Sequence, residues 1–429
     1  MILVDTNSQY ALCGFGIEGR STLNFLLHHG VPADHITICD HQPYDIGQLR
    51  GCAGHFGQDA FEHLDRFDQI WKTPGIPPGV LDCQPDRLRS QYQFFLDHCP
   101  SHILAVTGSK GKSTTCTVLH RMLVQAGLTA HLAGNVGIPF LDVLEACRPG
   151  DRVVCEVSSY MLTDAPRPRA DIAILLNLFP VHLDRHGDFP SYAASKKKIW
   201  IDAGWKLGGS MLRSLPFFAD ESDVDFFGES TDCGWRDGWF WFQGKQILAG
   251  ESMRLYGSHQ FPNLSFCFAI ADRLGIPFSY VCDVLTSFTG LDHRLQEVSR
   301  YDGRIYIDDS IATTPESAIN AIESFPNLGC IILGGQRRGY ENVTDLVSLI
   351  MRRHIPVVLM GDFGRAIVHH FGHDYCLYQT DLMQEAIRFA RTHAPVGSVI
   401  LLSPATPSFG IRKDFKHRGR DFAYRANHP

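Results

Sequence analysis

The sequence predicts an α/β protein made of three consecutive α/β domains. The chain has 429 residues, which is too long for a single hydrophobic core. Short apolar runs typical of buried parallel strands alternate with helical stretches, and this pattern restarts near residue 101 and near residue 292. We expect a Rossmann-like domain over residues 1–97, a P-loop ATPase-type central domain with a parallel sheet over residues 98–291, and a Rossmann-like C-terminal domain over residues 292–429.

The first domain opens with a βαβ unit. We expect a strand at residues 10–13, an amphipathic helix at 20–29 and a second strand that ends at Asp40. A further strand, DQIWKTPG, ends at a Pro-Gly turn.

The turn GFGIEG joins the first strand to the helix. Its glycines, Gly14, Gly16 and Gly19, would let the backbone approach a diphosphate at the helix N-terminus. Asp40, 21 residues beyond Gly19, would bind a ribose or a base. The alternative is a tight packing turn without a ligand.

The central domain carries a second glycine-rich turn, AVTGSKGKSTT. We expect strands at 102–108, 151–159 and 170–178, and short strands and hairpins over 218–250. After the first strand, backbone N–H groups would surround phosphates, Lys112 would reach the β and γ oxygens, and Ser113 would hold Mg²⁺. Val106 stands where the general P-loop pattern has its first glycine, so the loop is a variant. A chance GKST between a strand and a helix is the alternative.

Three further residues of this domain are candidate metal ligands. Glu156 ends a strand, where the carboxyl edge of a parallel sheet faces its ligands. His182 follows the next strand, and Lys196 lies 14 positions further on. For Lys196 the alternative is a solvated helix face, because it belongs to a run of three lysines.

The third domain is predicted to contain four short strands, RIYIDDS, CIILGG, PVVLMGD and VILLSPA, separated by helices. Asp309 and Ser310, Gly334 and Gly335, and Ser403 and Pro404 follow three of them and would form one rim. Such a rim would accept a small polar molecule. The alternative is polar turn chemistry without a ligand.

Composition excludes several classes of protein. A net charge of −7 with scattered Lys and Arg gives no footprint for nucleic acid. The 13 cysteines contain no CxxC pair, which predicts reduced core thiols in a cytoplasmic protein, and the histidines lack zinc-finger spacing. The N-terminus has no signal-peptide pattern, and no stretch of about 18 apolar residues occurs, so we expect no export and no membrane insertion.

An ordered set of motifs resembles the Mur ligases of peptidoglycan synthesis over essentially the whole chain. The motifs are GFGIEGRS, TPGI, TGSKGKST, GNVGIP, EVSSYML, HLDRHGDFPSYAASK, FTGLDHRL, DDSIATTP, LGG and SPATPSF with DFKHRG. Within the family, the short first domain and the C-terminal motifs are similar to the MurD type, which adds glutamate to UDP-N-acetylmuramoyl-L-alanine.

The resemblance implies a monomeric cytoplasmic enzyme that serves cell wall biogenesis, cell shape and cell division. Its first domain would bind UDP, its second ATP with two Mg²⁺ ions, and its third the amino acid. ATP would convert the alanyl carboxylate to an acyl phosphate, which the amine of glutamate attacks.

The resemblance also implies roles for individual residues. The UDP-substrate would contact Gly14, Gly16, Gly19, Asp40, Thr73, Pro74, Gly75, Asn135 and Ser158. ATP would contact Gly108, Ser109, Lys110, Gly111, Lys112, Ser113, Thr114, Asn263, Arg294 and Asp309. Metal ions would be held by Ser113, Glu156, His182 and a carbamylated Lys196, and the catalytic residues would be Lys112, His182 and Lys196. The amino acid would meet Ile311, Thr313, Ser408 and Phe415.

One position departs from the family pattern. The usual motif is DSKAT, with a lysine that meets a carboxylate of D-glutamate, and here the lysine is replaced by Ile311. An aliphatic side chain cannot make the charge-assisted hydrogen bonds of an ammonium group. Three interpretations follow: D-glutamate held by another cation (Arg337, Arg338 or Arg412), L-glutamate as in a variant branch that pairs with a separate epimerase, or another amino acid. DSIATTP is more similar to the L-glutamate branch.

Two hypotheses from other classes compete with a ligase. An NAD-dependent oxidoreductase would rest on GFGIEG and Asp40 alone and would leave TGSKGKST unexplained. A non-catalytic nucleotide-binding regulator of the same fold would not need Lys112, Glu156, His182 and Lys196.

Overall fold

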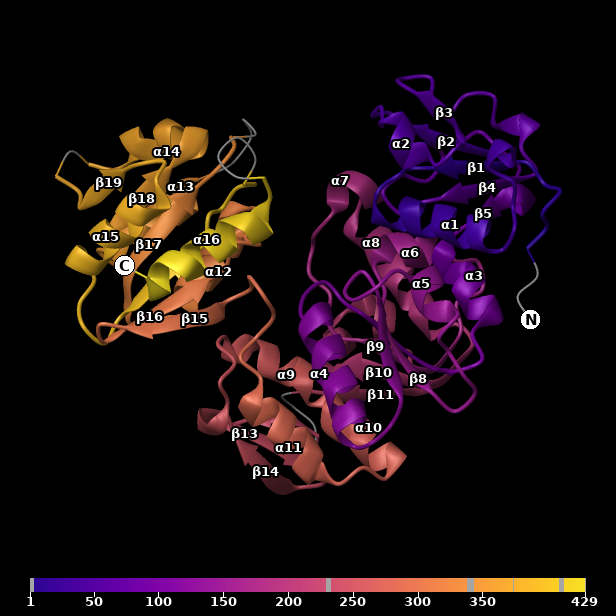
Figure 1. Cartoon of the computed structure of the whole chain (residues 1–429). Helices are drawn as coiled ribbons and strands as arrows, with labels where there is room; N and C mark the ends of the chain where they lie inside the picture. The colour runs from indigo at the N-terminus through magenta and orange to yellow at the C-terminus, as the bar shows by residue number, and fades with distance from the viewer. Residues whose placement is uncertain (1–3, 229–232, 338–342, 373, 409–412, 429) are drawn as a thin grey trace. The chain divides into compact units, whose positions relative to one another are not determined.

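The computed structural model describes residues 4–228, 233–337, 343–372, 374–408 and 413–428 (Figure 1). These residues form two compact units. The first unit contains Met1–Ala249 and Pro262–Val284, and the second contains Gly250–Phe261 and Leu285–Pro429.

The first sheet of the first unit has five parallel strands in the order β3-β2-β1-β4-β5. Its central strand is completely buried because apolar side chains cover both faces. The strands are β1 (Tyr10–Cys13), β2 (Ile36–Asp40), β3 (Ala53–Phe56), β4 (Gln69–Lys72) and β5 (Leu88–Arg89), with helices α1 (Ile17–His28), α2 (Ile46–Leu49) and α3 (Gln91–His98).

The second sheet has six parallel strands in the order β11-β10-β9-β6-β8-β7. They are β6 (His102–Thr107), β7 (Ala130–Gly134), β8 (Arg152–Glu156), β9 (Ala170–Leu175), β10 (Ala203–Gly209) and β11 (Val224–Phe227). The helices are α4 (Lys112–Gln125), α5 (Phe140–Leu144), α6 (Ser159–Thr163), α7 (Leu183–His186) and α8 (Phe189–Lys197), followed further along the chain by α9 (Phe261–Leu264), α10 (Phe266–Leu274) and α11 (Phe278–Ser287). A separate antiparallel sheet has three strands, β12 (Gly234–Arg236), β13 (Trp239–Phe242) and β14 (Lys245–Ala249).

The sheet of the second unit has the order β15-β16-β20-β17-β18-β19, in which β15 alone is antiparallel to its neighbour. Alternate strand residues enter two hydrophobic cores, one under α12, α13 and α14 and one under α15 and α16. The strands are β15 (Gln296–Tyr301), β16 (Arg304–Asp308), β17 (Leu328–Gly334), β18 (Val357–Met360), β19 (Leu377–Gln379) and β20 (Val399–Leu402). The helices are α12 (Pro315–Glu323), α13 (Thr344–Arg352), α14 (Gly361–Ile367), α15 (Met383–His393) and α16 (Phe415–Asn427).

The predicted fold class is confirmed, with three differences in detail. Within 218–250, the segment expected to form only short strands and hairpins, β11 instead extends the parallel sheet beside β10. The third sheet has six strands, not four, because the edge strand β15 is too polar and the edge strand β19 too short to be recognised as apolar runs. The helix predicted at 20–29 begins earlier, at Ile17. The domain boundaries 1–97, 98–291 and 292–429 stay a prediction.

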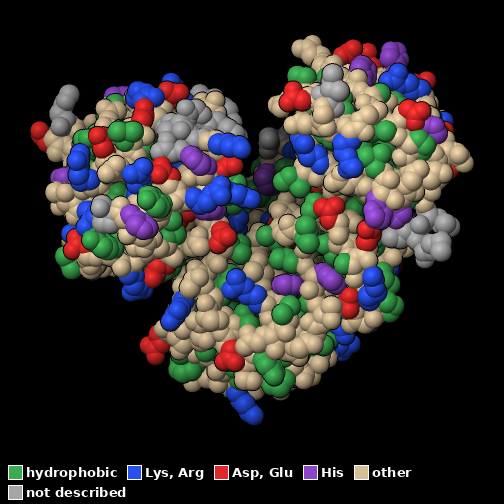
Figure 2. Space-filling view, viewed as in Figure 1, with side chains coloured by type: hydrophobic (Ala, Val, Ile, Leu, Met, Phe, Trp, Pro, Cys, Tyr) green, Lys and Arg blue, Asp and Glu red, His purple; other side chains and the backbone are tan. Residues whose placement is uncertain are grey.

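Three predictions from composition can be compared with the structure. All 13 cysteines lie in the described residues, none forms a disulfide, and most are buried, as expected. No helix in the described ranges combines the length and apolar character needed to cross a membrane. Basic and acidic side chains are interspersed over the face drawn in Figure 2.

Candidate active site

The P-loop connects β6 to α4 at the carboxyl edge of the second sheet. Gly108 and Gly111 have φ values of +155° and +81°, which an L side chain rarely adopts. The Nζ atom of Lys112 donates hydrogen bonds to the carbonyl oxygens of Gly108 at 2.9 Å and Ser109 at 3.2 Å. The ammonium group is therefore held against the loop predicted to surround phosphates.

Asn177 braces this loop and was not recognised from the sequence. Its Oδ1 accepts from the backbone N–H of Lys110 at 2.9 Å, and its Nδ2 donates to the Lys110 carbonyl at 3.0 Å and to Oδ1 of Asn263 at 3.1 Å. A Cβ atom at Gly111 would lie 2.4 Å from Nδ2 of Asn263. Asn263, a predicted ATP contact, thus packs on the loop. Asn177 could have been recognised from the sequence as a polar residue that closely follows a buried strand.

Glu156 ends β8 beside the P-loop strand, opposite Val106 on one side and Gly134 on the other. Its side chain is completely buried. Oε1 accepts a hydrogen bond from Nδ2 of Asn135 at 2.8 Å, whereas Oε2 has no partner among the described residues. Because an unpaired buried carboxylate oxygen is costly, this arrangement fits a cation ligand.

Lys196 projects from α8 toward the same edge and is 2% exposed. Its Nζ donates to Oγ1 of Thr107 at 3.0 Å. Burial and, to a smaller extent, the charge of Lys112 hold the pKa of Lys196 well below its usual value, and Glu156 opposes this shift. The solvated-face alternative is therefore wrong, because this amine is buried at the sheet edge that carries the P-loop.

His182 and Ser158 occupy the loops that follow β9 and β8. His182 precedes α7 with a φ of +58° and is exposed, and its ring centroid lies 5.6 Å from that of Tyr160. Ser158 caps α6 by accepting from the N–H of Met161 at 3.2 Å. No group of three or more His, Cys, Asp or Glu side chains within the described ranges is arranged to hold a metal. The predicted set of metal ligands differs from such a group, because it contains only two of these residue types, Glu156 and His182, together with Ser113 and Lys196.

The glycine turn of the first sheet is held by Asp40. Oδ2 of Asp40 accepts from the N–H of Phe15 at 2.7 Å and from the hydroxyl of Tyr44 at 3.3 Å. A Cβ at Gly14 would lie 2.1 Å from Oγ1 of Thr73, so this glycine is needed for packing. At Gly16 a Cβ would meet nothing within 4 Å, and this glycine leaves open space at the start of α1.

The turn formed by Thr73, Pro74 and Gly75 is tied to α7. Arg185 donates from Nη1 to the Gly75 carbonyl at 2.7 Å and from Nη2 to the Pro74 carbonyl. Its guanidinium also lies over the ring of Tyr160, 4.2 Å from the centroid. Sequence reasoning did not assign a role to Arg185, although it belongs to the motif HLDRHG.

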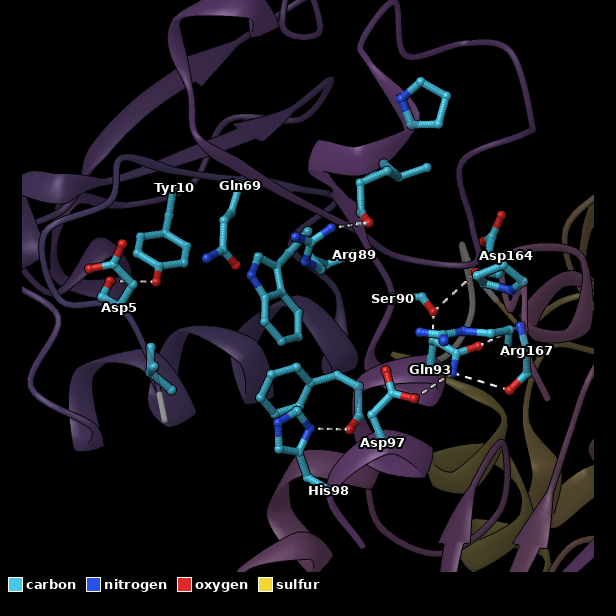
Figure 3. Close-up of a pocket in the computed structure, with 16 residues that line it drawn as sticks. Asp5, Tyr10, Gln69, Arg89, Ser90, Gln93, Asp97, His98, Asp164 and Arg167 are labelled. Atoms are coloured by element: carbon cyan, nitrogen blue, oxygen red, sulfur yellow. Dashed lines mark hydrogen bonds between the residues drawn. The ribbon is translucent and has the colours of Figure 1, made fainter. Parts of the chain in front are cut away.

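A cavity of about 450 Å³ lies at the other end of the first sheet (Figure 3). It is lined by Tyr10 and Gln69, which begin β1 and β4, and by Arg89. Figure 3 shows Gln93 hydrogen-bonded to Asp97 and to Arg167 at its rim. Ligands of open α/β sheets bind at the carboxyl ends of strands, so this cavity is not the predicted nucleotide site.

In the second unit, Asp309 follows β16 and is buried. Its Oδ2 accepts from Oγ of Ser403 at 2.7 Å, and its Oδ1 accepts from the N–H of Leu295 at 3.3 Å. Burial raises the pKa of Asp309 to about 7, while Ser403 and, more weakly, Arg294 oppose the rise. The structure thus brings together the two residues of this unit predicted to contact the nucleotide.

Arg418 joins the three strand-end loops that were predicted to form a rim. Its Nη atoms donate to the carbonyl oxygens of Ser310 at 2.9 Å, Gly334 at 3.1 Å and Thr406 at 3.1 Å, and the side chain is 4% exposed. Sequence reasoning assigned no role to this arginine, because two of the three loops it connects lie 84 and 108 positions away in the chain.

The predicted amino-acid contacts lie near this rim. Ile311, Thr313 and Phe415 are partly buried, and Ser408 is buried. Of the cations considered as replacements for the missing lysine, Arg337 is exposed, and Arg338 and Arg412 lie outside the described residues.

Comparison with known proteins agrees with this geometry. Residues 106–204 match the profile of the Mur ligase middle domain. The chain is 31% identical to UDP-N-acetylmuramoylalanine–D-glutamate ligase of Symbiobacterium thermophilum over 98% of both chains. It is 33% identical to UDP-N-acetylmuramoyl-L-alanine–L-glutamate ligase of Salinispora tropica over 96% of both.

Solved structures share the fold. MurF ligase of Thermotoga maritima in complex with ADP superposes with a TM-score of 0.59 at 16% identity, covering 92% of this chain and 95% of that one. UDP-N-acetylmuramate-alanine ligase MurC of the same organism gives a TM-score of 0.59 at 16% identity, covering 98% and 100%.

Proposed function

The chain belongs to the Mur ligase family, and we propose that it is an ATP-dependent ligase that joins glutamate to UDP-N-acetylmuramoyl-L-alanine. The observation that carries the proposal is the grouping of Lys112, Glu156 and Lys196 at the carboxyl edge of the second sheet. The relatives match nearly the whole chain, and their names support UDP-N-acetylmuramoyl-L-alanine as the substrate.

The reaction needs an activated carboxylate. An oxygen of the alanyl carboxylate attacks the γ-phosphorus of ATP, and the bond to ADP breaks, which gives an acyl phosphate. The amine of glutamate then attacks the acyl carbon, phosphate leaves with the bonding electrons, and the nitrogen loses a proton. Lys112, whose ammonium group is held against the P-loop, would neutralise the phosphoryl oxygens during the first step.

Two Mg²⁺ ions are part of the proposal, and the residues present fit them. Glu156 offers the unpartnered oxygen Oε2, and Ser113, at the start of α4, offers a hydroxyl. His182 and Lys196 complete the proposed ligand set. When bound, Mg²⁺ supplies electrostatic stabilisation of the transferring phosphoryl group.

Lys196 would take part after carbamylation. A neutral amine attacks CO₂, a C–N bond forms, one proton is released, and the product is a carbamate anion. The lowered pKa of Lys196 favours the neutral amine that this step requires. The modified side chain would then present oxygen to a cation.

The other assignments complete the proposal. Gly14, Gly16, Gly19, Asp40, the turn at Thr73–Gly75, Asn135 and Ser158 would contact the UDP-substrate. Asn263, Arg294 and Asp309 would contact ATP, and Thr313, Ser408 and Phe415 would contact glutamate. We place the enzyme in the cytoplasm as a monomer, in the synthesis of the peptidoglycan precursor on which cell shape and division depend.

For the enantiomer, Ile311 favours L-glutamate. The lysine that would meet a D-glutamate carboxylate is absent, and an isoleucine cannot replace its charge. Relatives named L-glutamate ligases match this chain as well as those named D-glutamate ligases do.

Isotope transfer tests the acyl-phosphate mechanism. UDP-N-acetylmuramoyl-L-alanine labelled with ¹⁸O in its carboxylate is supplied with ATP, Mg²⁺ and glutamate, and the released phosphate is analysed by mass spectrometry. We expect one ¹⁸O atom in each phosphate. Unlabelled phosphate together with ADP formation would exclude carboxylate activation.

A further inference from the structure

The cavity drawn in Figure 3 has no part in the proposed reaction. Its volume of about 450 Å³ lies within the range of about 300–1,000 Å³ that is usual for small-molecule sites. Residues of β4, β5 and α3 line it, together with the loop between α6 and β9. Segments that lie far apart in the chain therefore build one cavity, and its wall shows what kind of ligand it fits.

Aromatic rings form much of this wall. The rings of Trp71 and Phe94 meet at an angle of 53° with their centroids 5.1 Å apart, and the imidazole of His98 stacks on Phe94 with centroids 4.1 Å apart. Leu88 and Pro166 add aliphatic surface. Such a wall favours the flat apolar face of an aromatic ring.

The three carboxylates of the wall already have partners. Asp164 accepts from the buried ammonium group of Lys72. Asp97 accepts from Nε2 of Gln93 at 2.9 Å, and Asp5 accepts from a backbone N–H and a hydroxyl of the turn that follows it. Asp5 and Asp97 are also exposed, so water and salt screen their charge.

Two arginines of the wall keep donors for a ligand. Nη1 of Arg89 donates to the carbonyl oxygens of Asp86 and Leu88, and its other two nitrogens have no partner among the described residues. Arg167 binds Gln93 through its backbone, and its guanidinium group makes no hydrogen bond or ion pair within the described part of the chain. Because a guanidinium group stays charged and matches planar oxyanions, these side chains favour an anionic ligand.

Two further side chains of the wall lack partners. The Nε1–H of Trp71 is buried and makes no hydrogen bond to any residue that the structure describes. The amide of Gln69 makes none to the residues drawn in Figure 3. A buried donor without a partner is costly, and an acceptor brought by a ligand would remove that cost.

We propose that this cavity binds an aromatic oxyanion, a ring system that bears a carboxylate or a phosphate. The ring lies against Trp71 and Phe94, and the guanidinium groups of Arg89 and Arg167 supply the positive charge that holds the oxyanion. This site goes beyond the proposed ligase function and does not depend on it, because binding is measured without turnover.

NMR of the full chain with ¹⁵N-labelled tryptophan tests the site. The chain has six tryptophans, and the indole signal of Trp71 is the one missing from Trp71→Phe. The probes are 2-naphthoate, 2-naphthyl phosphate and the neutral 2-naphthamide. Their affinities are measured by calorimetry, which does not rely on that variant. We expect an anion to shift the Trp71 signal and to bind roughly 10-fold more tightly than the amide. The tighter anion identifies the oxyanion.

Arginine variants locate the charge that holds the anion. Arg89→Gln and Arg167→Gln should each weaken binding of the anion, and the double variant should bind it no more tightly than 2-naphthamide. Arg152→Gln is the matched control. Nη1 of Arg152 also donates to two nearby carbonyl oxygens, those of Gly150 and Asp151, but Arg152 does not line the cavity.

Three results would overturn the proposal. The first is equal affinity for the amide and for both anions. The second is binding of an anion that leaves the Trp71 signal in place, because the anion would then bind elsewhere. The third is an equal loss of affinity in Arg152→Gln and in the double variant, because the loss would then not depend on the cavity.

Discussion

Asn135 donates a hydrogen bond from Nδ2 to Oε1 of Glu156 over 2.8 Å, at the edge of the sheet that carries the P-loop. This contact fixes one oxygen of the buried carboxylate and leaves Oε2 without a partner in the described part of the chain. A carboxylate held in this way presents a defined oxygen to a metal ion.

Replacing Asn135 with alanine should therefore weaken metal binding. We expect an approximately 10- to 100-fold loss of affinity, because removing a group that orients a ligand has this effect. Binding of Mn²⁺, followed by electron paramagnetic resonance, measures the change. Unaltered Mn²⁺ binding with a raised KM for the UDP-substrate would instead assign Asn135 to the substrate.

Gly111→Ala should impair ATP binding through contact as well as strain. Gly111 and Gly127 both have a φ of +81°, but only at Gly111 would the new Cβ collide with Asn263, since nothing lies within 4 Å of a Cβ at Gly127. The left-handed backbone strain alone should cost about 1 kcal/mol of stability in each variant. We expect a raised KM for ATP in Gly111→Ala alone, measured by phosphate release, and equal effects of both variants would contradict this account.

The buried amine of Lys196 should make stability depend on pH. Its pKa is lowered in the folded protein, so between that pKa and the ordinary value near 10.4 the unfolded chain binds one proton more, and stability rises with pH. Lys196→Met removes this dependence. In CO₂-free buffer, the melting temperature of the unmodified protein relative to that of the variant should be higher at pH 9 than at pH 7. A constant difference in melting temperature would argue against a neutral Lys196.

Asp309 should produce the opposite trend. Its pKa is about 7 in the folded protein, above the ordinary value of 3.8, so between these values the folded state binds more protons and stability falls as pH rises. The melting temperature of Asp309→Asn relative to that of the unmodified protein should therefore rise between pH 5 and pH 8. No change in that difference would show that the carboxyl titrates normally.

The fold could be predicted from the sequence wherever strands are apolar and continuous. β6, β9 and β20 are such strands, and their order in the chain follows the alternation with helices. The edge strands β15 and β19 could not be recognised, because half-exposed strands carry polar residues and gain their conformation from pairing with a neighbour.

Local motifs of the candidate site were predictable, but contacts between distant segments were not. The P-loop follows from consecutive residues. Asn177, in contrast, binds Lys110, 67 positions earlier, and Arg418 binds Gly334 and Ser310, 84 and 108 positions earlier. The run of three lysines favoured exposure for Lys196, and tertiary packing overrode that local signal.

The most direct test of the central claim is phosphate release by the purified protein with ATP, Mg²⁺ and UDP-N-acetylmuramoyl-L-alanine, supplied with enantiopure L-glutamate or D-glutamate. We predict release only when all substrates are present, with L-glutamate as the acceptor. Turnover with D-glutamate alone would contradict the proposed enantiomer and keep the ligase. The absence of phosphate release with both enantiomers would contradict the assignment of this chain as a glutamate ligase.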